Sequence, residues 1–109
     1  MPRNDGLPPG TLALLILGVL ARQPLHGYAI AQTIALRSAD ALSVEEGSLY
    51  PALQKLLLRG RVRASPAVSE TGRAVRAYRI TPTGRRQLDA ERARHRQVTR
   101  AIAAVIDTP

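Results

Sequence analysis

The segment VEEGSLYPALQKLLLRG, residues 44–60, decides how this chain folds, because it contains the start, the buried face and the end of one helix. Gly60 follows the last turn, at the place where a residue in the left-handed conformation commonly ends a helix. Four leucines fall on one stripe at helical spacing and predict the face that packs on the core: Leu49, Leu53, Leu56 and Leu57.

The start of this helix has two candidates. Ser43 with Glu46 fits the capping box, in which each side chain bonds the backbone of the other residue. Ser48 is also a good N-cap and would place Pro51 in the first turn, where a missing N–H group loses no helical bond. The sequence leaves both starts open.

Two further helices are predicted before this segment. Residues 10–21 are apolar nearly all round, which favours a helix at the centre of the core. The alternative, a signal-peptide core, is disfavoured because its removal would strip the most apolar segment, and the stretch is too short to span a membrane. Residues 22–27 are a connector, in which Pro24 prevents the first helix from continuing. Residues 27–38 then form the second helix, with Ile30 and Ile34 on one face.

After Gly60 the period changes from helical to alternating. Residues 61–65 and 75–80 read as two short strands, joined by a turn at 66–74 that contains Gly72. Residues 81–106 then form a long helix, about 37 Å in length, with Thr81 as its N-cap and Pro82 at its first position.

This order of elements predicts a mainly α fold with a small β-hairpin, namely a winged helix-turn-helix with a C-terminal dimerisation helix. We expect a flexible arm at 1–9, a DNA-binding domain at 10–80 and the dimerisation helix at 81–109. A winged helix reads DNA by placing the second helix of its helix-turn-helix in the major groove.

The charge distribution points to a polyanionic partner. The chain carries sixteen Lys and Arg against eight Asp and Glu, a net charge of +8. Residues 55–86 account for the whole net charge of +8. They contain a single acid, Glu70, and nine bases: Lys55, Arg59, Arg61, Arg63, Arg73, Arg76, Arg79, Arg85 and Arg86. Double-stranded DNA is the expected partner. A membrane surface is not, because we expect no exposed aromatic residues beside the arginines.

Enzymatic and metal chemistry find little support. The absence of cysteine excludes disulfides, thiolate metal sites and Cys nucleophiles, and it fits a reducing cytoplasm. His26 and His95 lack the companions of a metal motif, and no nucleophile elbow or phosphate-cradling glycine loop is present. We therefore expect no catalytic residues, no metal and no cofactor.

Three segments, in this order and spacing, resemble the PadR family of bacterial transcription factors, the phenolic acid decarboxylase regulators. LLILGVLARQPLHGYAIAQTI (14–34) is similar to the family's opening, with its His-Gly-Tyr-x-Ile turn. VEEGSLYPALQKLLLRGRV (44–62) matches its Gly-Ser/Thr-Leu-Tyr-Pro-x-Leu signature. RAVRAYRITPTGRRQL (73–88) matches its arginine-rich wing strand, which ends Tyr-x-Leu/Ile-Thr-x-x-Gly.

The resemblance implies a homodimeric, cytoplasmic repressor on a pseudo-palindromic operator, with the C-terminal helix as the main dimer contact. The short C-terminus is similar to the smaller subgroup. Some small members hold flat drugs between tryptophans of the two subunits. Because this chain has no Trp and no Phe, we do not expect that ligand mode, and any small-molecule effector stays unknown.

The candidate DNA-binding residues fall in three places. Ser48, Tyr50, Pro51, Gln54 and Lys55 belong to the predicted recognition helix, where hydroxyl groups near the N-terminus can donate to phosphates or base edges. The alternatives are a Tyr50 that packs inward, a Ser48 that only caps, and a solvated face for Gln54 and Lys55.

The hairpin and the second helix supply the remaining candidates. Arg73 and Arg76 flank the hairpin tip and can clamp phosphates or enter a minor groove, although a soluble charged hairpin is the alternative. Tyr28 follows His26-Gly27 and can reach the DNA backbone, although we favour a place in the core for it. Glu45 and Glu46 are expected to complement the helix N-terminus and to lie off the DNA.

The last helix carries an apolar stripe interrupted by Glu91, and we predict that it packs on a second copy: Leu88, His95, Val98, Ile102, Val105 and Ile106. The alternative is that this helix folds back on its own domain. For function, the alternative is a winged-helix module for protein–protein interaction, in which the basic hairpin meets an acidic partner and DNA plays no part.

Overall fold

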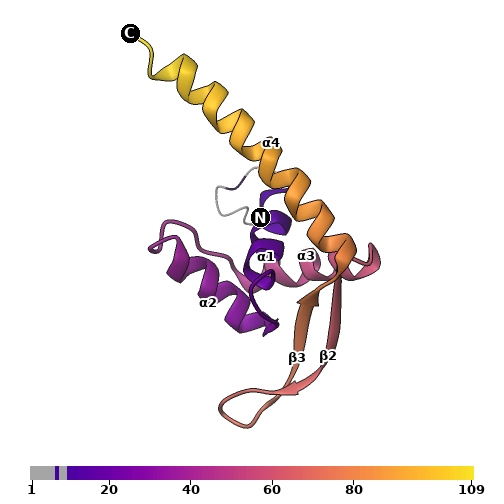
Figure 1. The fold of residues 1–109 in the computed structure, drawn as a ribbon. Coiled ribbons are helices and arrows are strands. Elements are labelled where there is room, and N and C mark those ends of the chain that lie inside the picture. The colour runs from indigo at the N-terminus through magenta and orange to yellow at the C-terminus, as the bar shows by residue number, and fades with distance from the viewer. Residues whose placement is uncertain (1–6, 8–9) are drawn as a thin grey trace.

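The computed structural model describes residue 7 and residues 10–109, so the predicted arm at 1–9 lies almost wholly outside the described residues. The chain forms seven elements, in the order α1 (Thr11–Leu20), β1 (Leu25–His26), α2 (Gly27–Arg37), α3 (Glu46–Leu58), β2 (Val62–Val68), β3 (Ala74–Ile80) and α4 (Pro82–Ile106) (Figure 1). This is the predicted winged helix-turn-helix followed by a long C-terminal helix. None of the described helices is long and apolar enough to cross a membrane.

The core is built around α1, as its all-round apolar sequence predicts. Helices α2, α3 and α4 all contact α1. Ile16, Leu17 and Leu20 of α1 are almost fully buried. Leucine and isoleucine side chains from the other helices close around them: Ile30, Ile34, Leu49, Leu53, Leu56 and Leu88. Burial of this aliphatic cluster positions α2 and α3 as a helix-turn-helix on one side of α1.

Both predicted N-caps of α3 are wrong. The helix begins at Glu46, and its cap is Glu45, which has an extended backbone and makes no side-chain cap bond. The Glu45 carbonyl oxygen accepts the N–H groups of Ser48 and Leu49, each at 3.0 Å. Pro51 consequently lies inside the helix, in the second turn. The observed start lies between the two predicted ones, because a Ser43 cap would start the helix at Val44 and a Ser48 cap would start it at Leu49.

The end of α3 confirms its prediction. Gly60 adopts a positive φ of 68°. Its N–H group donates to the Leu57 carbonyl at 3.0 Å, and the Arg61 N–H group donates to the Leu56 carbonyl at 2.9 Å. These two bonds form a Schellman motif, which satisfies carbonyl groups that the helix end leaves unpaired.

The strands form an antiparallel sheet in the order β1-β3-β2. We call β2, β3 and the turn between them the wing. Its strands are longer than predicted and its turn is shorter: the Ser69 N–H group donates to the Arg73 carbonyl at 2.9 Å, and Gly72 has a φ of 83°. Pro66 fits within β2 because β2 is an edge strand.

The short strand β1 was missed by the sequence reasoning. It pairs with the middle of β3 through Leu25 opposite Tyr78 and His26 opposite Ala77. Two residues are too few to show an alternating pattern, so only the contact with β3 defines this strand. The pairing joins the middle of β3 to the N-terminal end of α2.

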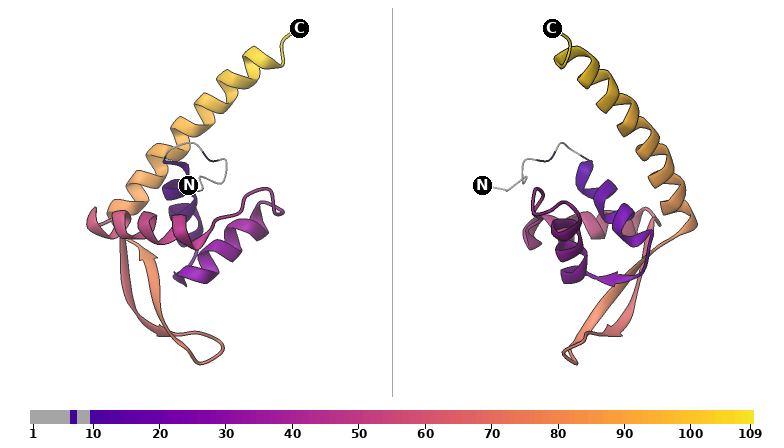
Figure 2. Two further views of the ribbon diagram at one scale, coloured as in Figure 1. Left: turned by 180° about the vertical axis from the view of Figure 1, so that it is seen from behind. Right: turned by 60° about the vertical axis from the view of Figure 1, so that its left-hand side comes forward.

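Thr81 joins the wing to α4, as predicted. Its hydroxyl accepts the Gly84 N–H at 3.0 Å and donates to the Gly60 carbonyl at 2.6 Å, and its own N–H donates to the Arg61 carbonyl at 3.1 Å. These bonds tie the end of α3, the end of β3 and the start of α4 together. The second half of α4 then extends away from the rest of the fold (Figures 1 and 2).

Candidate nucleic-acid interface

A cleft of about 960 Å³ lies between the wing and the N-terminal ends of α2 and α3. The wing turn reaches below the N-terminal end of α2 (Figure 1), and residues of the wing line the cleft on that side. Polar and charged side chains from all three elements line it: Tyr28, Gln32, Glu46, Tyr50, Arg73 and Arg76. The fold thus brings together residues up to 48 positions apart in the sequence, on a surface with both hydroxyl groups and cations.

All three tyrosines of the chain line this cleft, but only two of them are exposed there. Tyr28 is 60% exposed and Tyr50 is 45% exposed, whereas Tyr78 is only 5% exposed. Our expectation that Tyr28 belongs to the core is therefore wrong. Ile30 and Ile34 take the buried face of α2, so Tyr28 points outward, and Tyr78 of β3 is the aromatic residue of the core.

Tyr50 lies against the first residue of α2. A Cβ atom placed on Gly27 would be 2.8 Å from the Tyr50 hydroxyl oxygen and 3.0 Å from one of its ring carbons. Only a residue without a side chain leaves room for the ring in this position. Because Gly27 leaves this space open, the Tyr50 ring lies along the cleft and is about half exposed.

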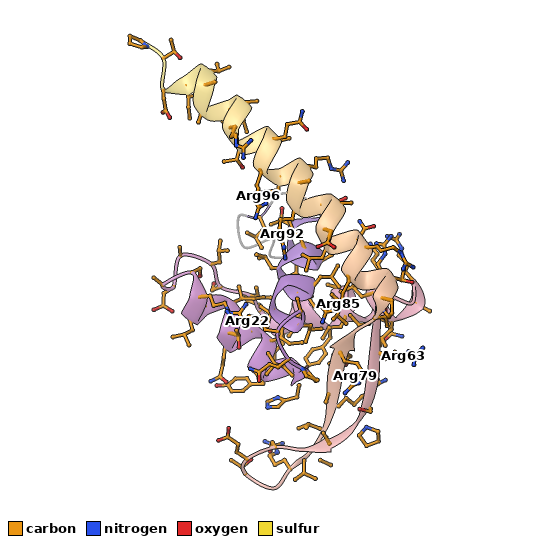
Figure 3. All side chains as sticks on the ribbon, in the orientation of Figure 1. Arg22, Arg63, Arg79, Arg85, Arg92 and Arg96 are labelled. Atoms are coloured by element: carbon orange, nitrogen blue, oxygen red, sulfur yellow. The ribbon has the colours of Figure 1, made fainter. Side chains whose placement is uncertain are left out.

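The wing carries arginines on both of its faces. Arg76 lies across from Pro66 and its guanidinium carbon is 5.9 Å from the centre of the Tyr78 ring, on the cleft side. Arg63 and Arg79 are direct cross-strand partners. Because side chains alternate along a strand, this pair lies on the face opposite Arg76; both are labelled in Figure 3.

The basic segment is therefore continuous in sequence but divided in space. At the start of α4, Arg85 donates to the Ala21 carbonyl at 3.2 Å, at the C-terminal end of α1 (Figure 3). Arg86 donates to the Thr83 hydroxyl at 3.2 Å. These two arginines have structural partners, and of the nine bases between residues 55 and 86 only Arg73 and Arg76 line the cleft.

The remaining candidates on α3 lie outside the cleft lining. Pro51, Gln54 and Lys55 are exposed on the side of α3 that faces away from the core, and Ser48 is half-buried. Pro51, Gln54 and Lys55 thus continue the exposed surface that Tyr50 begins on α3.

Several polar residues that line the cleft were not among the predicted DNA-binding residues: His26, Gln32, Glu46, Ser69, Glu70, Thr71 and Tyr78. Glu46 was expected to lie off the DNA. Helical spacing was the available signal, since Gln32 follows Tyr28 by four residues and Glu46 precedes Tyr50 by four. Among the described residues, no group of three His, Cys, Asp or Glu side chains is arranged to hold a metal ion.

The sequence model of the family described as "Transcriptional regulator PadR-like family" matches residues 16–90, which span all the elements that form the cleft. The chain belongs to the PadR-like family. Members of this family are transcriptional regulators, so the chain is a regulator and not an enzyme.

Curated proteins of bacteria are similar to this chain in sequence. The PadR-like chain is 34% identical over 89 residues to the transcriptional regulator Rv3488 of Mycobacterium tuberculosis, a match that covers 82% of this chain and 79% of that protein. It is also 42% identical over 78 residues to an uncharacterized 37.1 kDa transposon protein of Streptomyces fradiae, covering 72% of this chain but only 21% of the relative.

Solved structures show the same fold. A PadR family transcriptional regulator from Eggerthella lenta is similar with a TM-score of 0.77 at 26% identity, covering 92% of this chain and 85% of that one. Bacillus subtilis PadR, solved in complex with operator DNA, gives a TM-score of 0.68 at 26% identity, covering 77% of this chain and 47% of that one.

The C-terminal helix of this PadR-like regulator exposes most of its apolar stripe. Val98, Ile102, Val105 and Ile106 are all substantially exposed, so this part of α4 does not fold back on its own domain. Leu88 differs, because it is 4% exposed and belongs to the core of its own chain. His95 lies between the two regions, at the edge of a groove of about 360 Å³ whose apolar lining includes Leu14, Leu15, Ile34 and Leu42.

Proposed function

We propose that this PadR-like regulator binds double-stranded DNA sequence-specifically and acts as a homodimeric repressor on a pseudo-palindromic operator. The observation that carries the proposal is the cleft, where Tyr28 and Tyr50 face Arg73 and Arg76 across the space between the helix-turn-helix and the wing. The similarity to Bacillus subtilis PadR, solved with operator DNA, supports the same partner for this chain.

Helix α3 is the recognition helix in this proposal. Its outward side carries Tyr50, Gln54 and Lys55, while Leu49 and Leu53 are buried. Such a helix enters the major groove with its N-terminal residues at the base edges. Tyr28 lines the same cleft as that end, and Ser48 lies in the first turn of α3. Both can contact the adjoining phosphates, to which hydroxyl groups commonly donate.

The wing provides the electrostatic part of the contact. Arg73 and Arg76 lie on the cleft side, and the ion pairs between described residues involve α4 and not the wing. Unneutralised guanidinium groups bind phosphate in two-pronged geometry or enter a narrow minor groove. These contacts position the protein on DNA, while the recognition helix selects the sequence.

The exposed stripe on α4 supports the proposed homodimer. Val98, Ile102 and Val105 form an apolar surface at the end of the chain that extends furthest from the core. Two copies joined through one such surface are related by a two-fold axis, and that axis is matched by a pseudo-palindromic operator.

A protein–protein interaction module is the second candidate, because a basic cleft also suits an acidic peptide. DNA is favoured by the exposed face of α3, which a winged helix uses for base contacts. The two candidates differ in what they predict for a pool of random DNA sequences. A DNA-binding regulator should select one base sequence from the pool, whereas a module that binds acidic peptides should select none.

The test begins with DNA selected by the purified protein from a random pool, followed by salt titrations on the selected duplex and a scrambled duplex. Each phosphate contact contributes about −0.9 to the slope of log affinity against log salt. Arg76→Ala should weaken binding to both duplexes and reduce the slope by about one unit. Tyr50→Phe keeps the charge and the ring, so the slope should stay while specific affinity falls by about 1 kcal/mol.

The controls decide between the alternatives. If the wild-type protein enriches no sequence from the pool, the DNA-binding proposal is wrong and the interaction module gains support. If Arg76→Ala leaves the slope unchanged, the wing does not contact DNA. If Tyr50→Phe has no effect, the Tyr50 hydroxyl makes no contact that matters for recognition.

A further inference from the structure

Glu46 presents an acid where a DNA-binding surface is expected to be cationic. It is the first residue of α3, its side chain is exposed, and it lines the cleft together with Tyr50, Arg73 and Arg76. An acid in the first turn of a helix has a local benefit, because it complements the helix dipole. That benefit does not require the cleft, and in a cleft that receives phosphate the same charge repels the ligand.

The chemistry of the carboxylate limits what it can bind on DNA. An ionised carboxylate only accepts hydrogen bonds. Phosphate oxygens also only accept, so Glu46 cannot bind the backbone. In the major groove the donors are the amino groups of cytosine and adenine. Adenine presents its N7 acceptor beside the amino group, which suits an amide, whereas cytosine presents the amino group alone and suits a carboxylate.

The position of Glu46 brings it to the base edges. It lies one helical turn before Tyr50, on the N-terminal end that a recognition helix inserts into the groove. The next residue, Gly47, has no side chain, and a Cβ atom built on it would meet no atom within 4 Å. Gly47 therefore places no side chain between Glu46 and the groove.

We propose that Glu46 accepts a hydrogen bond from the amino group of one cytosine in each half-site, and that its charge weakens binding to all other DNA. Glu46 is thus a specificity-determining residue. This inference rests on the proposed DNA-binding function and assigns a base to it. The charge of Glu46 supports specificity in two ways. It attracts the amino group of cytosine, and it repels a phosphate when the protein lies on DNA in a different position.

Glu46→Gln is the decisive variant, and Glu70→Gln is its matched control. Both remove one negative charge from the cleft, but Glu70 belongs to the wing turn and Glu46 to α3. Both variants should bind scrambled DNA more tightly than the wild-type protein does, and to a similar extent. Only Glu46→Gln should lose the cytosine preference at one position in each half-site of selected DNA, with a shift towards adenine, which glutamine reads.

The selected position is then measured directly. Replacing that cytosine by thymine should lower the affinity of wild-type protein and of Glu70→Gln about tenfold, and that of Glu46→Gln less than about twofold. An unchanged cytosine preference in Glu46→Gln overturns the inference while leaving the DNA-binding proposal intact. An equal loss of the cytosine preference in Glu70→Gln also overturns the inference, because the preference would then depend on the total charge of the cleft and not on Glu46. Failure of the wild-type protein to select any DNA removes both proposals together.

Discussion

The hydroxyl-bearing edge of the Tyr50 ring lies beside Gly27, where a Cβ atom on the glycine would be 2.8 Å from the hydroxyl oxygen. This contact joins the first residue of α2 to the exposed face of α3. It connects the two helices of the helix-turn-helix at the surface, in addition to their contact through the core. The orientation of the tyrosine therefore depends on a residue more than twenty positions earlier in the chain.

Gly27→Ala should displace Tyr50 without unfolding the protein. Tyr50 is half exposed, so its ring can rotate away, and alanine is the better helix former by up to about 1 kcal/mol. We expect thermal stability close to that of the wild type, and a loss of specific DNA affinity of about 1 kcal/mol if the hydroxyl contact is broken. Binding titrations of Gly27→Ala, Tyr50→Phe and the double variant check this. Additive losses would show that the two residues act independently.

Gly84→Ala should destabilise the fold itself. A Cβ atom on Gly84 would be 2.1 Å from the backbone carbonyl oxygen of Arg61 and 2.8 Å from a side-chain carbon of Ile80. Backbone cannot rotate away as a side chain can, so α4 must shift from the end of β3. We expect a loss of about 1–3 kcal/mol in the free energy of unfolding, measured by urea denaturation. Thr83→Ala, at the exposed neighbouring position, is the control and should change it by less than about 0.5 kcal/mol.

Ile102→Asp should give a folded monomer. Ile102 is 53% exposed in the single chain, so the aspartate meets solvent in the monomer, but it places an unpaired charge inside a dimer interface on α4. Sedimentation velocity measures the oligomeric state, and circular dichroism the helix content. Gln97→Asp adds the same charge at another exposed position of α4, away from the stripe, and should stay dimeric. A dimer of Ile102→Asp as tight as the wild type would exclude this surface.

Arg63→Glu should stabilise the wing. Arg63 and Arg79 are cross-strand partners, and like charges directly opposite each other weaken an antiparallel pair. An opposite charge should raise the free energy of unfolding by about 0.2–1 kcal/mol at low salt, and the gain should shrink as salt screens the pair. Arg63→Gln separates relief of repulsion from new attraction and should give a smaller increase. Equal stability of all three proteins at low salt would show that the two side chains avoid each other.

Local sequence determined the elements whose signals lie within a few residues. Thr81 and Pro82 start α4, and Gly60 ends α3 with the expected left-handed residue, because caps are made by neighbours in the chain. The spacing of Leu49, Leu53 and Leu56 identified the buried face of α3. Together with the three family motifs, these signals were enough to predict the winged helix.

Tertiary structure decided which residues share a surface. The two residues of β1 form a strand only because β3 supplies the partner, and α3 starts at Glu46, between the starts that the two predicted caps would give. Tyr28 is exposed while Tyr78 is buried, although both are tyrosines beside apolar residues. A helix cap or an apolar stripe depends on residues that are near one another in the sequence, so it can be predicted from the sequence alone. The cleft that joins Tyr28, Glu46 and Arg76 depends on how three elements pack around α1, and that packing is fixed by the burial of the whole core.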